Sequence, residues 1–198
     1  MCPRKVDNRK DILLLMLYSP GKGDDVNEPI VGRTRVVKMM FLFKHEVLSH
    51  FRRGTEINED NFYEFFPWNF GPFSQQAYDD LTFFTLRGFV EVSEADEEGL
   101  PESAEEWHEW LSNSGAALDT AEPEEYHEEV FSLTAKGVNF AASLYEGLST
   151  SQRQLLKEFK TRLTTTPLRA ILRYVYQTYP EMTDESKIKE QVLGQHSH

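Results

Sequence analysis

The chain has 198 residues, 39% of them hydrophobic and 13% aromatic, which suits one domain or one domain with an appended helical segment. Its net charge of -12 disfavours general affinity for nucleic acid or membranes, and its apolar runs are too short to span a bilayer. The single cysteine, Cys2, excludes an internal disulfide framework and a cysteine-rich zinc site, and it favours the cytoplasm as the location.

Charge is distributed unevenly along the chain. Between Arg87 and Lys136 there is no Lys or Arg, although the interval is rich in Asp and Glu. From Arg153 to Arg173 the sign reverses, and Glu158 is the only acidic residue. One molecule therefore carries an acidic segment and a basic one.

The first predicted helix begins near residue 8. Apolar side chains within residues 12–18 recur at helical spacing, and Asp7 or Asn8 can act as the N-cap. Pro20 ends this helix, and the polar stretch that follows, as far as Val31, is predicted to be a loop.

A second helix is predicted from Thr34, its N-cap, to about Gly54. Its apolar positions form a broad buried face, with Arg35 and Lys38 on the solvent side. These cations and Arg33 are interpreted as salt-bridge partners or solvated groups, because the sequence around them has no phosphate-binding loop motif.

An aromatic stretch follows. Residues 62–66 are short, aromatic and bounded by proline, which predicts a strand. Gly71-Pro72 turns the chain, and Ser74 caps a third helix. Leu86 is expected to cover the end of that helix, and Gly88 to close it. Its predicted buried stripe consists of Ala77, Leu81 and Phe84.

Two strands are predicted next, residues 89–92 and residues 126–133, which pair with each other. Between them, residues 95–125 read as an acidic insertion. Within it, Trp107 and Trp110 lie on one side of a short helix, where they dock on the core or contact a partner.

The remainder of the chain is helical in pattern. Helices are predicted over residues 134–144 and 151–163. A further helix is capped by Thr166, has Pro167 at its first position and extends to Tyr179. A last short helix is expected to start at residues 183–187.

This order of elements predicts an α+β, mainly helical fold. Residues 8–146 have the order of a winged helix-turn-helix-like core whose wing loop is the acidic insertion. Residues 150–193 form a C-terminal helical extension packed on that core.

Several short motifs, in the same order, resemble a known family. They are Gly32-Arg-Thr-Arg-Val-Val-Lys-Met-Met-Phe-Leu-Phe43, Phe70-Gly-Pro-Phe-Ser74, Leu81 with Gly88-Phe-Val90, Phe131-Ser-Leu-Thr-Ala-Lys-Gly137, and Thr166-Pro-Leu-Arg-Ala-Ile-Leu-Arg-Tyr-Val-Tyr176. They are similar to the YwgA-like prokaryotic proteins and, more distantly, to the Panacea or SocA-like antitoxin domain. The resemblance implies a prokaryotic or mobile-element protein without catalytic activity. Its SocA-like branch implies binding of a toxin partner, or delivery of that toxin to a protease.

Aromatic residues form the first candidate site. There are more of them before Ser74 than one short strand buries, and exposed aromatics concentrate binding energy in protein interfaces. This favours a protein partner, such as a toxin or defence effector encoded nearby, and a homodimer stays open. The predicted partner-binding residues are Phe66, Trp68, Phe70, Phe73, Trp107 and Trp110.

A DNA-binding transcriptional regulator is the alternative. In a winged helix the third helix enters the major groove, where glutamine side chains can read adenine. Asp79 and Asp80 on that helix would meet phosphates unfavourably, and so would an acidic wing. The candidate nucleic-acid contacts are Gln75, Gln76, Arg87, Arg153, Lys157 and Lys160.

No catalytic constellation stands out. The histidines lack ligand spacing, and His45 is interpreted as a core residue. Ser74 lacks the glycines of a nucleophile elbow. We therefore predict no enzyme activity, no metal and no cofactor.

Overall fold

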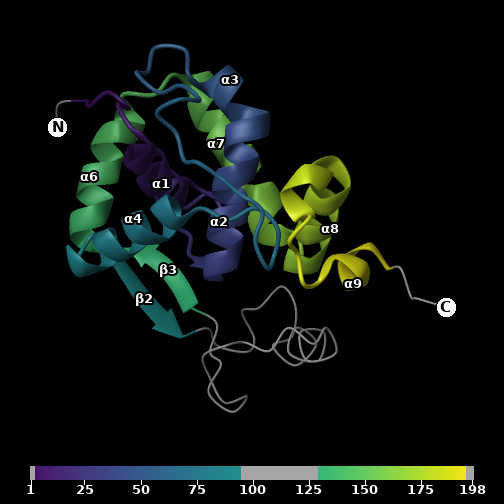
Figure 1. The fold of residues 1–198 in the computed structure, drawn as a ribbon. Helices are drawn as coiled ribbons and strands as arrows, with labels where there is room; N and C mark the ends of the chain where they lie inside the picture. The colour runs from purple at the N-terminus through teal and green to yellow at the C-terminus, as the bar shows by residue number, and fades with distance from the viewer. Residues whose placement is uncertain (1–2, 95–128, 195–198) are drawn as a thin grey trace.

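The computed structural model describes residues 3–94 and 129–194 (Figure 1). Its first part contains α1 (Arg9–Tyr18), β1 (Ile30–Val31), α2 (Arg33–Leu42), the π-helix η1 (Phe43–Val47), α3 (Leu48–Phe51), α4 (Gln75–Leu86) and β2 (Val90–Glu94). Its second part contains β3 (Glu129–Leu133), α6 (Ala135–Glu146), α7 (Thr150–Thr165), α8 (Leu168–Thr178), the 3-10 helix η4 (Pro180–Thr183) and α9 (Lys189–Leu193). The fold is therefore α+β and mainly helical, as predicted.

Helices α1 and α2 form the centre of the molecule (Figure 1). In α1 every residue from Asp11 to Leu17 is buried, and in α2 every residue from Arg35 to Leu42 is buried. A helix that is buried on all sides lies inside the fold, with other elements covering each face. The prediction that α2 exposes Arg35 and Lys38 is therefore wrong.

The described strands form one small antiparallel sheet, in the order β1-β3-β2. The predicted pairing of the last two strands is confirmed, with Val92 opposite Phe131. Strand β1 was predicted as loop, because two residues are too few to show a period of two. The Asn27 side chain fixes this segment, since it donates to Leu133 O (3.0 Å) and accepts from Leu133 N (2.7 Å).

Most helix starts follow from side-chain caps. The Asn8 side chain completes a capping box with Asp11, and Ser74 Oγ accepts from Ala77 N at 3.3 Å, as expected. Two cap predictions are wrong. Gly32, with φ of 88°, is the N-cap of α2 in place of Thr34, and Pro167 is the N-cap of α8.

The strand predicted for residues 62–66 does not form. The only pairing there is an isolated bridge between Phe66 and Phe73. Consecutive residues of a strand point to opposite faces, but Phe62 and Tyr63 are both buried in the core. This segment is therefore held by packing of its side chains in the core, without forming a strand.

The C-terminal helices pack on the centre of the fold, and α8 contacts both α2 and α9. The last helix is displaced from its prediction, since residues 180–183 are 3-10 helix and α9 starts at Lys189. Leu86 does not cover the end of α4, because 81% of it is exposed. No helix in the described ranges is long and apolar enough to cross a membrane.

Candidate functional site

Residues 66–73 form a small loop, here called the aromatic hairpin, that leads into α4. Phe66 and Phe73 exchange two backbone hydrogen bonds, of 3.0 and 2.9 Å. Trp68 and Gly71 exchange two more, of 3.2 and 2.9 Å. The loop therefore has its own backbone ladder, which fixes where its side chains point.

Gly71 allows this hairpin to close against α8. Its φ is +79°, a conformation that favours glycine. A Cβ added at this position would lie 2.7 Å from Tyr176 Cε1, closer than real contacts allow. The turn therefore requires glycine for two reasons, its positive φ angle and the close approach of the Tyr176 ring.

Two other parts of the chain hold the hairpin from outside. Lys38 Nζ, inside α2, donates to Pro72 O at 2.7 Å. In the C-terminal extension, Lys187 N and Ser186 Oγ donate to Asn69 O at 3.0 and 3.1 Å. The backbone of the hairpin is thus attached to the core on one side and to the extension on the other.

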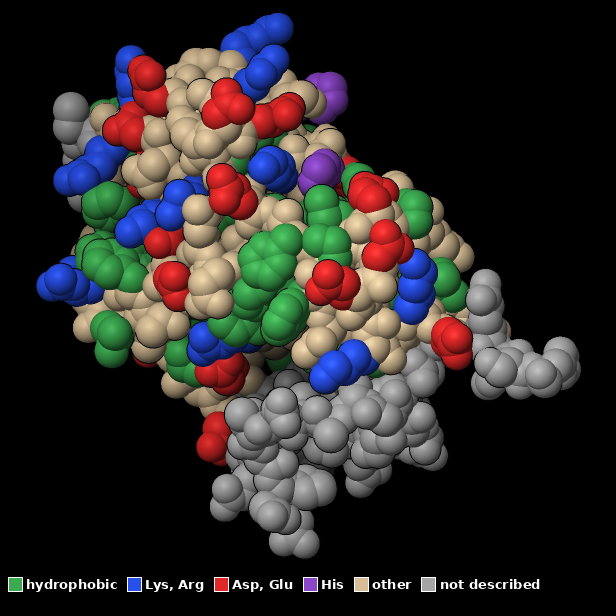
Figure 2. All heavy atoms as spheres, viewed as in Figure 1, with side chains coloured by type: hydrophobic (Ala, Val, Ile, Leu, Met, Phe, Trp, Pro, Cys, Tyr) green, Lys and Arg blue, Asp and Glu red, His purple; other side chains and the backbone are tan. Residues whose placement is uncertain are grey.

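The side chains on this fixed backbone stay accessible. Phe66 is 43% exposed and Trp68 is 47% exposed. Their rings and the Phe73 ring form a cluster, with centroids 5.4 to 6.3 Å apart. Figure 2 shows a group of hydrophobic side chains near the middle of this face, over the segment that enters α4. Exposed aromatics on a preorganised backbone are typical of interface hot spots, because little conformational freedom is lost on binding.

The structure brings together part of the predicted partner-binding set. Phe66, Trp68 and Phe73 are neighbours, whereas Phe70 packs against the hydrophobic core. Trp107 and Trp110 lie outside the described residues. The candidate surface is therefore the hairpin cluster. Tyr78, whose ring centroid is 5.0 Å from that of Phe73, packs against the core beside it.

The residues proposed to read DNA on α4 are engaged within the protein or separated from one another. Gln75 is exposed but bonds Asp79 at 2.9 Å, and Gln76 accepts from the backbone N–H of Glu64 at 3.1 Å. Asp80 is buried and forms ion pairs with two residues of the first helical turn of α1, Arg9 and Lys10. Arg87 lies at the far end of α4, over the Phe83 ring.

The cations predicted on α7 also serve the fold. Lys160 is fully buried, and its Nζ donates to the carbonyl oxygens of Leu17, Ser19 and Glu28 at 2.7 to 2.8 Å. Arg153 donates to two carbonyls at the end of α6, and Lys157 pairs with Asp24. Helices α4 and α7 lie apart in Figure 1, so the predicted nucleic-acid residues do not form one surface.

Sequence reasoning missed a class of residue, the buried cation whose side chain donates to backbone carbonyls. Besides Lys160, it includes Arg35, whose guanidinium donates to Leu163 O at 2.5 Å and Thr166 O at 2.6 Å, and Lys38. Burial lowers the pKa of Lys38 to about 7. The sequence signal for burial of Lys38 was its position within the apolar run Val36-Val37-Lys38-Met39-Met40.

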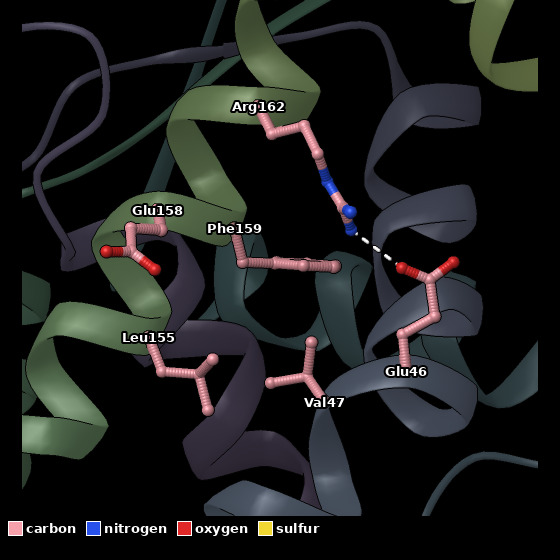
Figure 3. Close-up of a pocket in the computed structure, with 6 residues that line it drawn as sticks. All are labelled: Glu46, Val47, Leu155, Glu158, Phe159 and Arg162. Atoms are coloured by element: carbon pink, nitrogen blue, oxygen red, sulfur yellow. Dashed lines mark hydrogen bonds and ion pairs between the residues drawn. The ribbon is translucent and has the colours of Figure 1, made fainter.

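A pocket of about 320 Å³ lies between η1 and α7 (Figure 3). Val47, Leu155 and Phe159 form its apolar wall, and Arg162 Nη2 meets Glu46 Oε2 across it at 2.7 Å. This ion pair joins η1 to α7 across the pocket. Glu158, which also lines the pocket, accepts a hydrogen bond from Gln154.

Other chemistry has little support in the described ranges. No group of three or more His, Cys, Asp or Glu side chains there could hold a metal ion. His45 is exposed, contrary to its interpretation as a core residue, and packs on the rings of Phe41 and Tyr179. Burial of part of the ring, followed by the charge of Lys44, lowers the pKa of His45.

Fold and site together define a mainly helical α+β protein that presents a fixed aromatic hairpin. Comparisons with family models, with curated proteins and with solved structures find no match for this chain.

Proposed function

We propose that the chain is a non-catalytic protein-interaction module, antitoxin-like or accessory to a prokaryotic defence or mobile-element system. Its partner-binding surface is the aromatic hairpin. The observation that carries this proposal is the contrast within residues 66–73, where the backbone is bonded to two other parts of the fold and the rings of Phe66 and Trp68 are exposed. Burial of such rings against a partner is favourable, and a rigid loop pays little entropy on binding.

We also propose that the core is winged-helix-like. The described elements begin with α1 and β1, followed by the contiguous segments α2, η1 and α3, counted here as one helix, and then by α4, β2 and β3. The sheet order β1-β3-β2 places the first of these strands beside the last. In this assignment α4 is the third helix, and β2 and β3 form the wing.

Binding of DNA through α4 is the alternative, and exposed Gln75 in the first turn of the helix favours it. The neighbouring charges oppose it. Asp79 is exposed one turn later, and the cations of α7 are bonded to carbonyls, to Asp24 or to Glu46. Because phosphate contacts supply most nonspecific affinity, a surface with few free cations binds DNA weakly.

The proposal is tested by co-expression with the proteins encoded beside its gene, followed by affinity measurements on any complex that co-purifies. Trp68→Ala and Phe66→Ala should each weaken the complex by about 30-fold, the loss expected for a hot-spot aromatic. Phe83→Ala is the matched control, since Phe83 is 39% exposed on α4, outside the hairpin.

Wild-type affinity in Trp68→Ala and Phe66→Ala would overturn the assignment of the surface. A DNA mobility shift at low salt that Gln75→Ala abolishes, while Trp68→Ala does not, would support the alternative instead.

A further inference from the structure

A second pocket, of about 480 Å³, lies along α6, away from the aromatic hairpin. Helix α6 supplies most of its lining, and the N-terminal segment and Phe89, the residue before β2, complete it. The lining side chains used below are Arg4, Phe89, Lys136, Asn139, Phe140 and Ser143. Its volume falls in the range of pockets that hold small molecules.

The backbone around this pocket is fixed at both ends. Arg4 N donates to Ser143 O at 2.9 Å, which attaches the N-terminal segment to α6. At the other end, Thr134 N donates to Phe89 O at 3.0 Å. Gly137 lets α6 approach so closely that an added Cβ would lie 2.1 Å from Phe89 O. The pocket is therefore held by backbone contacts.

Its base is aromatic and its rim is cationic. The rings of Phe89 and Phe140 meet edge to face, with centroids 5.7 Å apart. Lys136 Nζ lies 4.1 Å from the centroid of Phe89, and Arg4 Cζ lies 4.6 Å from that of Phe140. Each cation thus stays close to a ring, where the two attract each other.

These cations have spare capacity for an anion. Lys136 Nζ donates to Arg87 O at 2.7 Å, and an ammonium has three donors. No carboxylate within the described ranges pairs with either cation. Asp11 feels the charge of Arg4, but the backbone N–H groups of Asp7 and Asn8 already bond its carboxylate. Among the described residues, the pocket lining contains these two cations and no Asp or Glu.

We propose that the α6 pocket binds a small amphipathic carboxylate. Its apolar body lies on the rings of Phe89 and Phe140, and its carboxylate accepts hydrogen bonds from the Lys136 ammonium. Arg4 adds a second positive charge at the rim, and the Asn139 amide offers a further donor.

The experiment is a titration of the full chain with phenylpropionate, with phenylpropanol as the neutral analogue, followed by NMR at the amides of residues 136–143. We expect saturable shifts there, and binding of the carboxylate about tenfold tighter than that of the alcohol, as for one charge-assisted contact. Lys136→Met should lose about that factor for the carboxylate and leave the alcohol unchanged. Arg4→Leu should lose less, and Arg52→Leu, an exposed arginine outside this pocket, should lose nothing.

The absence of saturable shifts at residues 136–143 would overturn the proposal, and so would equal affinity for the two compounds. Trp68→Ala should leave the titration unchanged. A failed partner experiment at the hairpin and a failed titration here are therefore separate results.

Discussion

The aromatic hairpin and helix α7 both form hydrogen bonds to backbone groups of other segments, but they differ in which of their own groups are buried. In the hairpin, the polar groups of the backbone are bonded inward and the apolar rings of Phe66 and Trp68 face outward. In α7 the apolar residues are buried as usual, but Lys160 also points inward and bonds three carbonyls. The hairpin, which is aromatic in sequence, is thus partly exposed, and α7, which is basic in sequence, contributes a lysine to the core.

The two regions also differ in whether their side chains find partners within the chain. An exposed ring on a fixed loop leaves unused binding capacity, because its apolar surface has no partner within the chain. A buried ammonium leaves none, because its donors replace water around carbonyls at the end of α1 and in the following loop. The hairpin therefore leaves apolar surface exposed, whereas Lys160 on α7 is bonded within the fold.

The largest effect is expected at Lys160. Lys160→Met should lower the free energy of unfolding by about 3 kcal/mol, because buried carbonyls lose a charged donor. Urea denaturation measures the change. Lys157→Met, on the same helix, is the control and should leave the midpoint nearly unchanged, since exposed ion pairs contribute little. Equal effects in the two variants would remove the distinction between internal and surface cations on α7.

A smaller loss is expected in the turn of the hairpin. Gly71→Ala should destabilise the protein by about 2 kcal/mol, from an unfavourable φ together with contact with Tyr176. Gly54→Ala separates the two causes, because Gly54 has φ of +82° and nothing within 4 Å of its added Cβ. Thermal unfolding of both variants gives the comparison. A Gly71→Ala loss no larger than that of Gly54→Ala would show that the ring contact contributes nothing.

Lys38, which bonds the hairpin to α2, should make the free energy of unfolding depend on pH. Burial lowers the pKa of Lys38 to about 7, so above that pH the unfolded chain holds a proton that the native protein has lost. Stability should therefore rise with pH, by at most about 1.4 kcal/mol per unit for this group. Below pH 7 both states are protonated and this dependence vanishes.

Lys38→Met should flatten that rise between about pH 7 and about pH 9, measured as the free energy of unfolding in urea. Lys160, whose pKa burial also lowers to about 7, supplies the slope that stays. Parallel curves for wild type and Lys38→Met would mean that Lys38 keeps its proton in the native state.

The sequence predicted the elements whose signals are local. Ser74 is predicted as a cap, and the first cap is narrowed to Asp7 or Asn8, of which the structure uses Asn8, because a side-chain oxygen next to a helical pattern is a short-range feature. The hairpin of β2 and β3 was recognised from two β-prone segments. Residues 62–66 are predicted to be a strand because aromatic residues are common both in strands and in irregular segments that pack on helices. Composition alone does not distinguish these two cases.

For the candidate site, the sequence indicated the residue types and not their directions. Of the aromatics that it selected for partner binding, Phe66, Trp68 and Phe73 lie together, whereas Phe70 packs on the core. It grouped Lys160 with Arg153 and Lys157 because charge alone places all three at the surface. Whether a lysine is buried depends on carbonyls distant in the sequence, and for Lys160 these lie more than 130 residues away.

By itself, the sequence determined that this is a mainly helical α+β chain, that one helix starts at Asp7 or Asn8 and another at Ser74, and that a glycine turn precedes the latter. Those features depend on residues close together in the chain. Only the tertiary structure decided which aromatics stay exposed and which cations become internal. Those outcomes depend on burial and on backbone partners from other segments, which no local pattern encodes.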